Sequence, residues 1–243
     1  MTTEVGTVTG PAGAQAVRRA LDVLHSFHDN GPDLSASDLA RRLGLSTSTA
    51  HRLARTLLAA DFLEQDADTA RYRLGPAVTE LGRLSYHQRR LHLAAPELRD
   101  LAERTGAVAD LALRSGAHAV IVAGGAVTPR VGLRRPLHAS ALGMVLLAWQ
   151  GRAYGTPAPG SESARTRELG YVVDDGECAL EARTLAVPVL GREGLARFAL
   201  GLRAAPAVLT DARLGWFLGQ ARACARALEV LLLPPSERQP PQA

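Results

Sequence analysis

The segment from Ser46 to Leu57 constrains this chain most, because its polar and apolar residues separate onto two sides of a helix. At 3.6 residues per turn, three basic side chains and the hydroxyl of Ser48 fall within about 100° of one another around the axis. A helix of this kind packs through its apolar side and leaves its basic side free for a partner. The basic side carries Ser48, His51, Arg52 and Arg55, and the apolar side carries Ala50, Leu53, Ala54 and Leu57.

A shorter helix is expected just before this one. Ser35, followed three residues later by Asp38, fits a capping box, and Gly44 is suited to end the helix that the box begins. Ser46 can then cap the next helix. The first turn of that helix places hydroxyls beside unpaired backbone N–H groups, which suits contact with phosphates and base edges. These hydroxyls belong to Thr47, Ser48 and Thr49.

A short hairpin is expected after these helices. Residues 62–65 and 71–74 read as strands on either side of a polar turn, whose tip carries Asp66 and Asp68. We expect the flanks of this hairpin, rather than its acidic tip, to contact phosphates or the minor groove. The candidate contacts are Arg71, Tyr72 and Arg73. Two helices, a glycine turn and a hairpin in this order predict a winged helix-turn-helix that reads the major groove of DNA.

The charge of the chain agrees with this interpretation but does not require it. The net charge is +4 and the isoelectric point is near 9.7. Residues 39–60 contain four arginines and no acid, so the positive field is local to the two helices. A solvated amphipathic helix, or a winged-helix module that binds a protein instead of operator DNA, stays open as an alternative. Salt-dependent binding to a duplex would discriminate between them.

Length and composition limit the number of domains and the classes of protein to which the chain can belong. A chain of 243 residues with 47% hydrophobic residues can form two modest domains. It has no apolar run of about 18 residues and no leader-like start, so we expect no membrane partner and a cytoplasmic location. The cysteines and histidines lack the spacing of a metal motif, so neither metal nor cofactor is expected. Cys224 lies in an apolar helical pattern and is predicted to be a buried structural thiol.

The rest of the first half is predicted to contain an arm and two further helices. Residues 1–13 are expected to be a disordered arm, and residues 14–75 to form the winged domain. A helix from about Gln15 should pack through Val17, Ala20, Leu21, Leu24 and Phe27. Residues 76–93 are predicted to be a linker helix, whose apolar seam either pairs with a second copy or lies on its own domain. The seam comprises Ala77, Leu81, Leu84, Gln88 and Leu91.

The second half mixes strands and helices, which predicts an α+β domain over residues 94–233 and a disordered tail over 234–243. Strands are expected at 107–114, 118–125, 171–173, 184–190 and 195–203. Helices are expected at 96–104, 140–149, 162–169 and 210–232, with a loop over 151–163.

With both halves in view, the chain resembles the IclR family of bacterial transcriptional regulators. The matching segments are RRALDVL at 18–24, DLARRLGLSTSTAHRLARTL at 38–57, RYRLG at 71–75, LHASALGMVLLAW at 137–149, ELGYVVDDGE at 168–177 and TLAVPV at 184–189. The resemblance implies an N-terminal winged helix-turn-helix on double-stranded operator DNA, a linker helix and a C-terminal GAF-like effector-binding domain. It also implies a homodimer or dimer of dimers and a small organic effector, often a carboxylate or an aromatic compound.

The resemblance also assigns expected roles to single residues. Arg19, Ser48, Thr49, His51 and Arg52 match the DNA-contacting positions of the family. The effector-binding positions match Leu137, His138, Ala139, Ser140, Gly143, Asp175, Thr184, Gly201 and Arg203.

Arg203 is the candidate that suggests a ligand class. It alternates with Ala199 and Gly201 along a predicted strand, so it shares a face with small residues that leave room beside it. If that face lines a cavity, the guanidinium can bind a carboxylate in a bidentate manner. The alternative is that Arg203 reaches solvent at the end of the strand. An enzyme is disfavoured, because His138 and Ser140 are close together but lack a nucleophile elbow.

Overall fold

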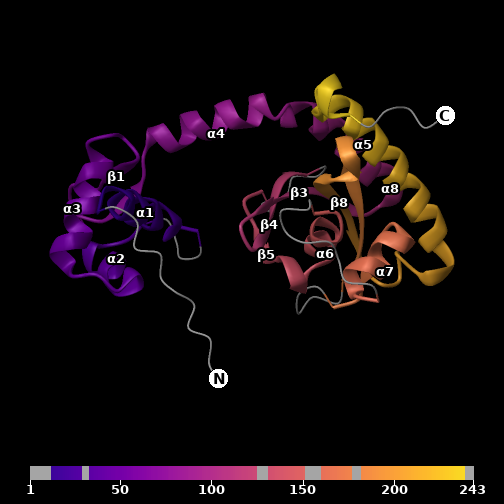
Figure 1. Cartoon of the computed structure of the whole chain (residues 1–243), viewed down its shortest axis with the longest axis horizontal. Helices are drawn as coiled ribbons and strands as arrows, with labels where there is room; N and C mark the ends of the chain where they lie inside the picture. Colours follow the sequence, from indigo (N-terminus) through magenta and orange to yellow (C-terminus); the bar gives the residue numbers. More distant parts are fainter. Residues whose placement is uncertain (1–11, 29–32, 125–130, 151–159, 177–181, 239–243) are drawn as a thin grey trace. The chain divides into compact units, whose positions relative to one another are not determined.

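The computed structural model describes residues 12–28, 33–124, 131–150, 160–176 and 182–238. The chain divides into two compact units, residues 1–85 and residues 86–243, and Figure 1 shows the elements of each. The expected arm 1–13, loop 151–163 and tail 234–243 lie wholly or partly outside the described residues, as does Cys178. No helix among the described residues is both long and apolar enough to cross a membrane.

The N-terminal unit contains three helices and a two-stranded hairpin, as the sequence predicts. The hairpin pairs Leu63 with Leu74 and Gln65 with Tyr72, and Leu34 forms an additional bridge to Tyr72. The elements are α1 (Ala12–His25), α2 (Ala36–Leu43), α3 (Thr47–Leu58), β1 (Leu63–Gln65) and β2 (Tyr72–Leu74).

The predicted helix ends are confirmed. Ser35 and Asp38 form a capping box at the start of α2, and Gly44 ends that helix with a φ of 62° in the left-handed region. Ser46 caps α3 by accepting a hydrogen bond from the backbone N–H of Thr49. These caps satisfy N–H groups that a helix cannot pair internally, and they fix the turn between the two helices.

The core of this unit corrects one expectation about α1. Val17 and Leu21 were expected to pack, but their exposed fractions are 61% and 50%. The helix packs instead through Val23, which is fully buried, and through its neighbours Ala20, Leu24 and Phe27. Val17 and Leu21 lie on the flank of this stripe, because one face of a helix is too narrow to bury every apolar residue at similar spacing.

Helix α4 (Pro76–Gln88) begins at the predicted proline, but it ends earlier than expected. Arg90 adopts a left-handed conformation with a φ of 56°, and the chain continues as the 3-10 turn η1 (Leu91–Leu93). A residue in this conformation cannot continue an α-helix, so the expected single helix over 76–93 is wrong at its C-terminal end. None of the described side chains of α4 is buried, and Leu81 and Leu84 are each more than half exposed.

The C-terminal unit is built on a six-stranded antiparallel sheet with the order β5-β4-β3-β8-β7-β6. Of these strands, β5 was not predicted, because two arginines and a proline carry no strand pattern. The strands are β3 (Val108–Ser115), β4 (His118–Gly124), β5 (Arg134–Pro136), β6 (Val172–Asp174), β7 (Arg183–Leu190) and β8 (Ala196–Ala204).

Helices cover both faces of this sheet, in agreement with a GAF-like fold (Figure 1). Helices α5 and α8 lie on one face, which we call the α8 face, and α6 lies on the other, which we call the α6 face. The helices are α5 (Ala94–Thr105), α6 (Ala141–Ala148), α7 (Glu162–Leu169) and α8 (Asp211–Leu232), with 3-10 turns η2 (Leu137–Ala139), η4 (Arg192–Gly194) and η5 (Pro235–Glu237).

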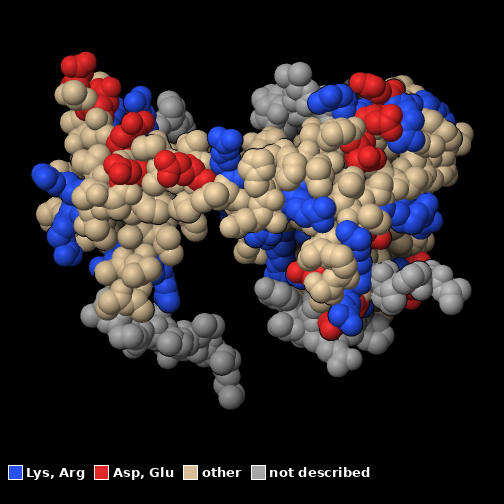
Figure 2. Space-filling view, turned by 90° about the horizontal axis from the view of Figure 1, so that it is seen from above, with Lys and Arg blue, Asp and Glu red and all other residues tan. Residues whose placement is uncertain are grey.

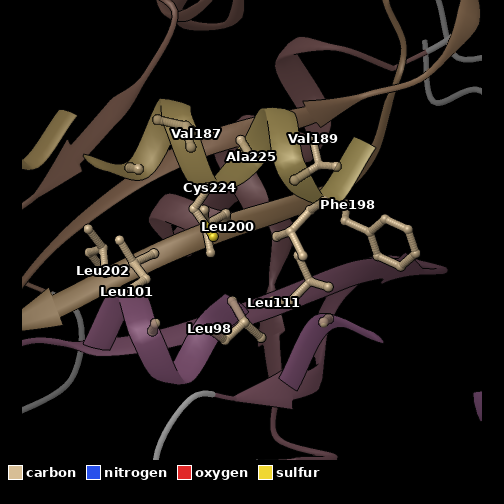
Figure 3. Close-up of a cluster of buried hydrophobic side chains, with 14 of the residues drawn as sticks. Leu98, Leu101, Leu111, Val187, Val189, Phe198, Leu200, Leu202, Cys224 and Ala225 are labelled. Carbon is tan, nitrogen blue, oxygen red and sulfur yellow. The ribbon is translucent and has the colours of Figure 1, made fainter. Parts of the chain in front are cut away.

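From Phe198 to Arg203, side chains alternate between the two faces along β8, as predicted, whereas an irregularity in the pairing before Phe198 leaves Ala196 on the α6 face. Leu200 and Leu202 pack into the core under α5 and α8, where Figure 3 shows them beside Leu101 and Cys224. Ala199 packs on the α6 face, and a Cβ added at Gly201 would lie 3.0 Å from the side chain of Leu142. Small residues on the α6 face of β8 therefore allow α6 to pack close to the sheet.

The chain beyond α8 is more ordered than expected. Residues 234–238 were assigned to a disordered tail, but Arg197 pairs with Glu237 and Arg192 donates to the carbonyl oxygen of Ser236. Arg238 in turn donates to the carbonyl oxygen of Leu233 at the end of α8. These bonds fix the segment against η4 and β8.

Candidate functional site

The outer side of α3 is an exposed basic surface, as the sequence predicts. His51, Arg52 and Arg55 are exposed, while the four apolar residues on the other side of the helix are buried. No ion pair to Arg52 or Arg55 is found within the described residues. Figure 2 shows basic side chains at the outer left edge of this unit, where Figure 1 places α3. The helix thus presents unpaired cations on one side and packs through the other.

The hydroxyls at the start of α3 form a small network with the cap. Ser46 Oγ lies 3.1 Å from Ser48 Oγ and 2.8 Å from Thr49 Oγ1. Thr47 and Ser48 are exposed, whereas Thr49 is half-buried. The turn therefore offers hydroxyls that are already oriented toward solvent at the end of the helix where backbone N–H groups are available.

Arg71 links the hairpin to the first helix of the motif. Its guanidinium pairs with Asp33 and, at 3.3 Å, with Asp38. The hydrogen bond to Asp33 and the field of both carboxylates raise the pKa of Arg71. The pKa of Asp38 is lowered to about 2, first by the hydroxyl and backbone N–H of Ser35 and then by the nearby arginines. Arg71 thus holds the wing in place.

Arg73 is also paired, but it is more accessible. Its Nε lies 2.6 Å from Glu64 Oε1 across the hairpin, and 59% of its side chain is exposed. The hydrogen bond to Glu64 raises its pKa. Contact between DNA and either wing arginine remains a prediction.

Tyr72 does not lie where the sequence suggested. Its side chain is completely buried in the core of the N-terminal unit, so the expected contact with DNA is wrong. Alternation along β2 points Tyr72 inward and leaves Arg73 outside. Its hydroxyl has no hydrogen-bond partner among the described residues, and burial raises its pKa.

Arg19 lies on α1, beside the turn that leads into α3. It is half-buried and lines, with Arg18, a concavity of about 270 Å³ beside the turn between α2 and α3. The other residues of this concavity are Gln15, Asp22, Leu43, Gly44 and Leu45.

The second candidate site is a group of polar residues on the α6 face of the sheet, which we call the buried polar group. Thr184 of β7 pairs in register with Arg203 of β8, and Asp110 of β3 pairs with Gly201. Asp110 and Thr184 are 3% and 2% exposed, and Arg203 is half-buried. The Thr184 hydroxyl has no hydrogen-bond partner in the described part of the chain. Three polar side chains from three adjacent strands therefore lie on the same face of the sheet, beside the small residues of β8 against which α6 packs.

Sequence reasoning missed Asp110. Its signal was available, since it is the one acid within the apolar strand AVADLALR. A carboxylate fully buried in a sheet is costly unless it has a specific role or partner, so such a residue marks a candidate site.

Several predicted effector residues have structural roles, and whether they also contact an effector stays a prediction. Ser140 is buried, accepts a hydrogen bond from Gly143 N at 3.1 Å and donates to the carbonyl oxygen of Pro136. A Cβ at Gly143 would lie 2.3 Å from the Leu137 carbonyl oxygen, so only glycine permits this crossing of η2 over α6. Leu137 belongs to the core, while His138 and Ala139 are exposed.

Asp175 is not part of the buried polar group. Its carboxylate lies 2.7 Å from Arg183 Nε, and Arg183 also pairs with Asp211 at the start of α8. Alternation along β7 places Arg183 on the α8 face, opposite Thr184.

Cys224 lies on the buried side of α8, as predicted, and burial raises the pKa of its thiol to about 12. No group of three or more potential metal ligands occurs within the described ranges.

Family models match both units in the expected order. The IclR helix-turn-helix domain matches residues 16–67, and the bacterial transcriptional regulator IclR C-terminal domain matches residues 86–158 and 160–230. The chain belongs to the IclR family. It is therefore a regulator of the DNA-binding, helix-turn-helix class.

Curated relatives in this family are transcriptional regulators. The chain is 32% identical over 240 residues to the transcriptional regulator XynR of Escherichia coli K12, a match that covers 88% of this chain and 95% of XynR. It is 30% identical over 227 residues to the transcriptional repressor AllR of the same strain, with 83% and 84% covered.

Solved structures agree with the fold of this IclR-family regulator. A putative IclR regulator from Silicibacter sp. TM1040 is 25% identical, has a TM-score of 0.77, and is matched over 93% of this chain and 98% of its own. An IclR homologue from Microbacterium hydrocarbonoxydans, complexed with 4-hydroxybenzoate, is 26% identical with a TM-score of 0.71, and 89% and 98% are covered.

The buried position of Tyr72 gives a test of its role. The Tyr72→Phe variant should be as stable as the parent or more stable, because it removes a buried hydroxyl that lacks a partner. Its affinity for an operator duplex should stay within about twofold. Hydrogen exchange of the β1–β2 amides and a gel-shift titration at fixed salt would measure both. A marked loss of affinity with unchanged exchange would show that the hydroxyl contacts DNA after all.

Proposed function

We propose that this IclR-family regulator reads operator DNA with the exposed side of α3 and responds to a small organic effector held at the buried polar group. The exposed side of α3 carries the DNA part of this proposal. A helix whose start bears oriented hydroxyls, and whose outer side bears unpaired arginines, has the chemistry to contact phosphates and base edges in the major groove. The candidate contacts are Ser46, Thr47, Ser48, Thr49, His51, Arg52 and Arg55.

Replacing Arg52 by Ala should weaken operator binding without loss of fold, because the side chain is exposed. A bidentate arginine contact with guanine contributes about 1–3 kcal/mol, so we expect roughly a 5- to 150-fold loss of affinity. A gel-shift titration at fixed salt, with a duplex from upstream of the gene, measures it.

The matched control is Arg99→Ala, which removes the same charge from the exposed side of α5. Its affinity should stay near that of the parent. Equal losses in both variants would mean that only the overall charge matters. No loss in Arg52→Ala would mean that the basic side of α3 is only solvated, and the protein-interaction alternative would then be favoured.

The buried polar group supports an effector that carries an acidic function. Arg203 supplies a permanent positive charge, and the neighbouring Thr184 supplies a hydroxyl whose hydrogen-bonding capacity is unused among the described residues. Ligand sites commonly combine an apolar surround with a few such polar groups. The bound 4-hydroxybenzoate in the Microbacterium relative is a carboxylate of the expected class.

The role of Arg203 can be tested with 4-hydroxybenzoate as probe and 4-hydroxybenzamide as its uncharged counterpart. The parent should bind the carboxylate more tightly than the amide, and Arg203→Ser should weaken carboxylate binding at least about tenfold while operator binding persists. Calorimetry of the full-length protein measures this. Arg226→Ser, on the exposed side of α8, is the control. An unchanged titration in Arg203→Ser would refute the assignment.

We further propose that two copies associate through α4. Its Leu81 and Leu84 are 51% and 56% exposed, and they lie on the seam that the sequence predicts. Exposed leucines at helical spacing are favourable when a second helix covers them. A dimer would also present two copies of α3 to two half-sites of an operator.

Replacing Leu84 by Glu should shift the protein toward monomer and weaken operator binding, because the seam would then carry a charge. Light scattering with a gel shift measures both effects. Thr79→Glu places the same charge at another exposed position of α4 and should change neither. A dimer mass that is unaffected by Leu84→Glu would exclude this helix as the contact.

A further inference from the structure

Two neighbouring central strands of the C-terminal unit, β3 and β8, separate at one end. The ladder between β3 and β8 runs from the pair Val108–Arg203 to the pair Ala112–Ala199 and stops there. Beyond this point β3 continues to pair with β4 as far as Ser115, whereas β8 pairs with β7 down to Ala196. The sheet therefore opens between the end of β3 and the start of β8.

A groove of about 450 Å³ lies at this opening. Its apolar lining includes Leu113 of β3, Phe198 of β8 and Leu232 of α8. Figure 3 shows Phe198 at the edge of the hydrophobic cluster, beyond Val189 and Leu111. Phe198 itself is buried, but Leu113 is half-buried, so part of the apolar lining is accessible from the groove.

The polar lining of the groove is mainly cationic. Three arginines, Arg89, Arg114 and Arg197, line it, against one carboxylate, Glu237. Arg197 pairs with that carboxylate at 2.5 Å, and Arg114 donates to Gln150. Arg89 is exposed and has no ion-pair partner within the part of the chain that the structure describes. The groove thus retains a positive charge that its own residues do not neutralise.

We propose that this cationic groove is a second ligand site of the C-terminal unit, which takes a small organic anion with an apolar body. The apolar body would lie on Leu113 and Phe198, and the anionic group would meet Arg89. The volume lies within the usual range for small-molecule sites, and an arginine beside an apolar surface favours a carboxylate over a neutral ligand.

The groove is distinct from the buried polar group. Phe198 belongs to the cluster on the α8 face, whereas Gly201 and Arg203 lie on the α6 face of the same strand. The groove also includes Gln88, the last residue of α4, and Arg89, which follows it. An anion bound here would contact the chain directly after α4, a position from which occupancy can influence the end of that helix.

The test uses the full-length protein with Arg203→Ser, so that the proposed effector site on the α6 face is disabled. Fluorine NMR of 4-fluorobenzoate should show saturable binding, and 4-fluorobenzamide should bind at least tenfold more weakly. Adding Arg89→Glu should weaken 4-fluorobenzoate binding at least tenfold. Arg99→Glu makes the same charge change on the exposed side of α5 and should have little effect.

Each contrary result overturns the proposal. Absence of saturable binding would show that the groove takes no such anion, and equal losses in Arg89→Glu and Arg99→Glu would show a nonspecific charge effect. Binding that strengthens as the protein is diluted would mean that a second copy of the chain occupies the groove instead. None of these readouts involves DNA, and every protein compared carries the same Arg203→Ser replacement, so their failure is separate from failure of the proposed regulatory function.

Discussion

The alternation of side chains along β8 from Phe198 to Arg203 organises the C-terminal unit. Even-numbered residues such as Leu200 and Leu202 face α5 and α8, and odd-numbered residues such as Ala199 and Gly201 face α6. A shift of one residue would exchange the two faces and bury Arg203 under α8, so the hydrophobic pattern fixes the register strongly. The buried polar group depends on this register, and so does the placement of Phe198, the aromatic side chain of the cationic groove, on the opposite face.

A single carboxylate has a comparable role in the N-terminal unit. Asp38 completes the capping box of α2 and also contacts Arg71 of the wing. Its low pKa, near 2, means that this stabilisation is complete above the ordinary carboxylate pKa of about 4 and is lost as the pH falls toward 2. At neutral pH the same charge therefore orients both the helix pair and the hairpin, and the exposed side of α3 is presented on a fixed support.

The elements with a strong local signal could be predicted from the sequence. The caps at Ser35 and Ser46, the turn at Gly44 and the sides of α3 follow from short-range chemistry, and the structure confirms them. Contacts that depend on distant residues could not be predicted in the same way. Arg71 and Tyr72 are both predicted from the sequence as wing residues that contact DNA. In the structure, Arg71 forms an ion pair with Asp33, and Tyr72 is buried in the core. Likewise, Asp174 pairs in register with Thr184 of β7, but its neighbour in sequence, Asp175, forms an ion pair with Arg183, which lies on the opposite face of the sheet.

The residues that break local rules are the informative ones in this chain. An aspartate in a buried strand, a threonine without a hydrogen-bond partner in the described residues and an arginine among small residues each reduce stability by themselves. Their meeting on one face of three adjacent strands is difficult to explain by packing alone, because valine or leucine would serve a core better. Functional sites are where such conflicts with folding are expected. The buried polar group is therefore a stronger candidate for effector recognition than the exposed His138 or the capping residue Ser140, although the sequence motif includes all of them.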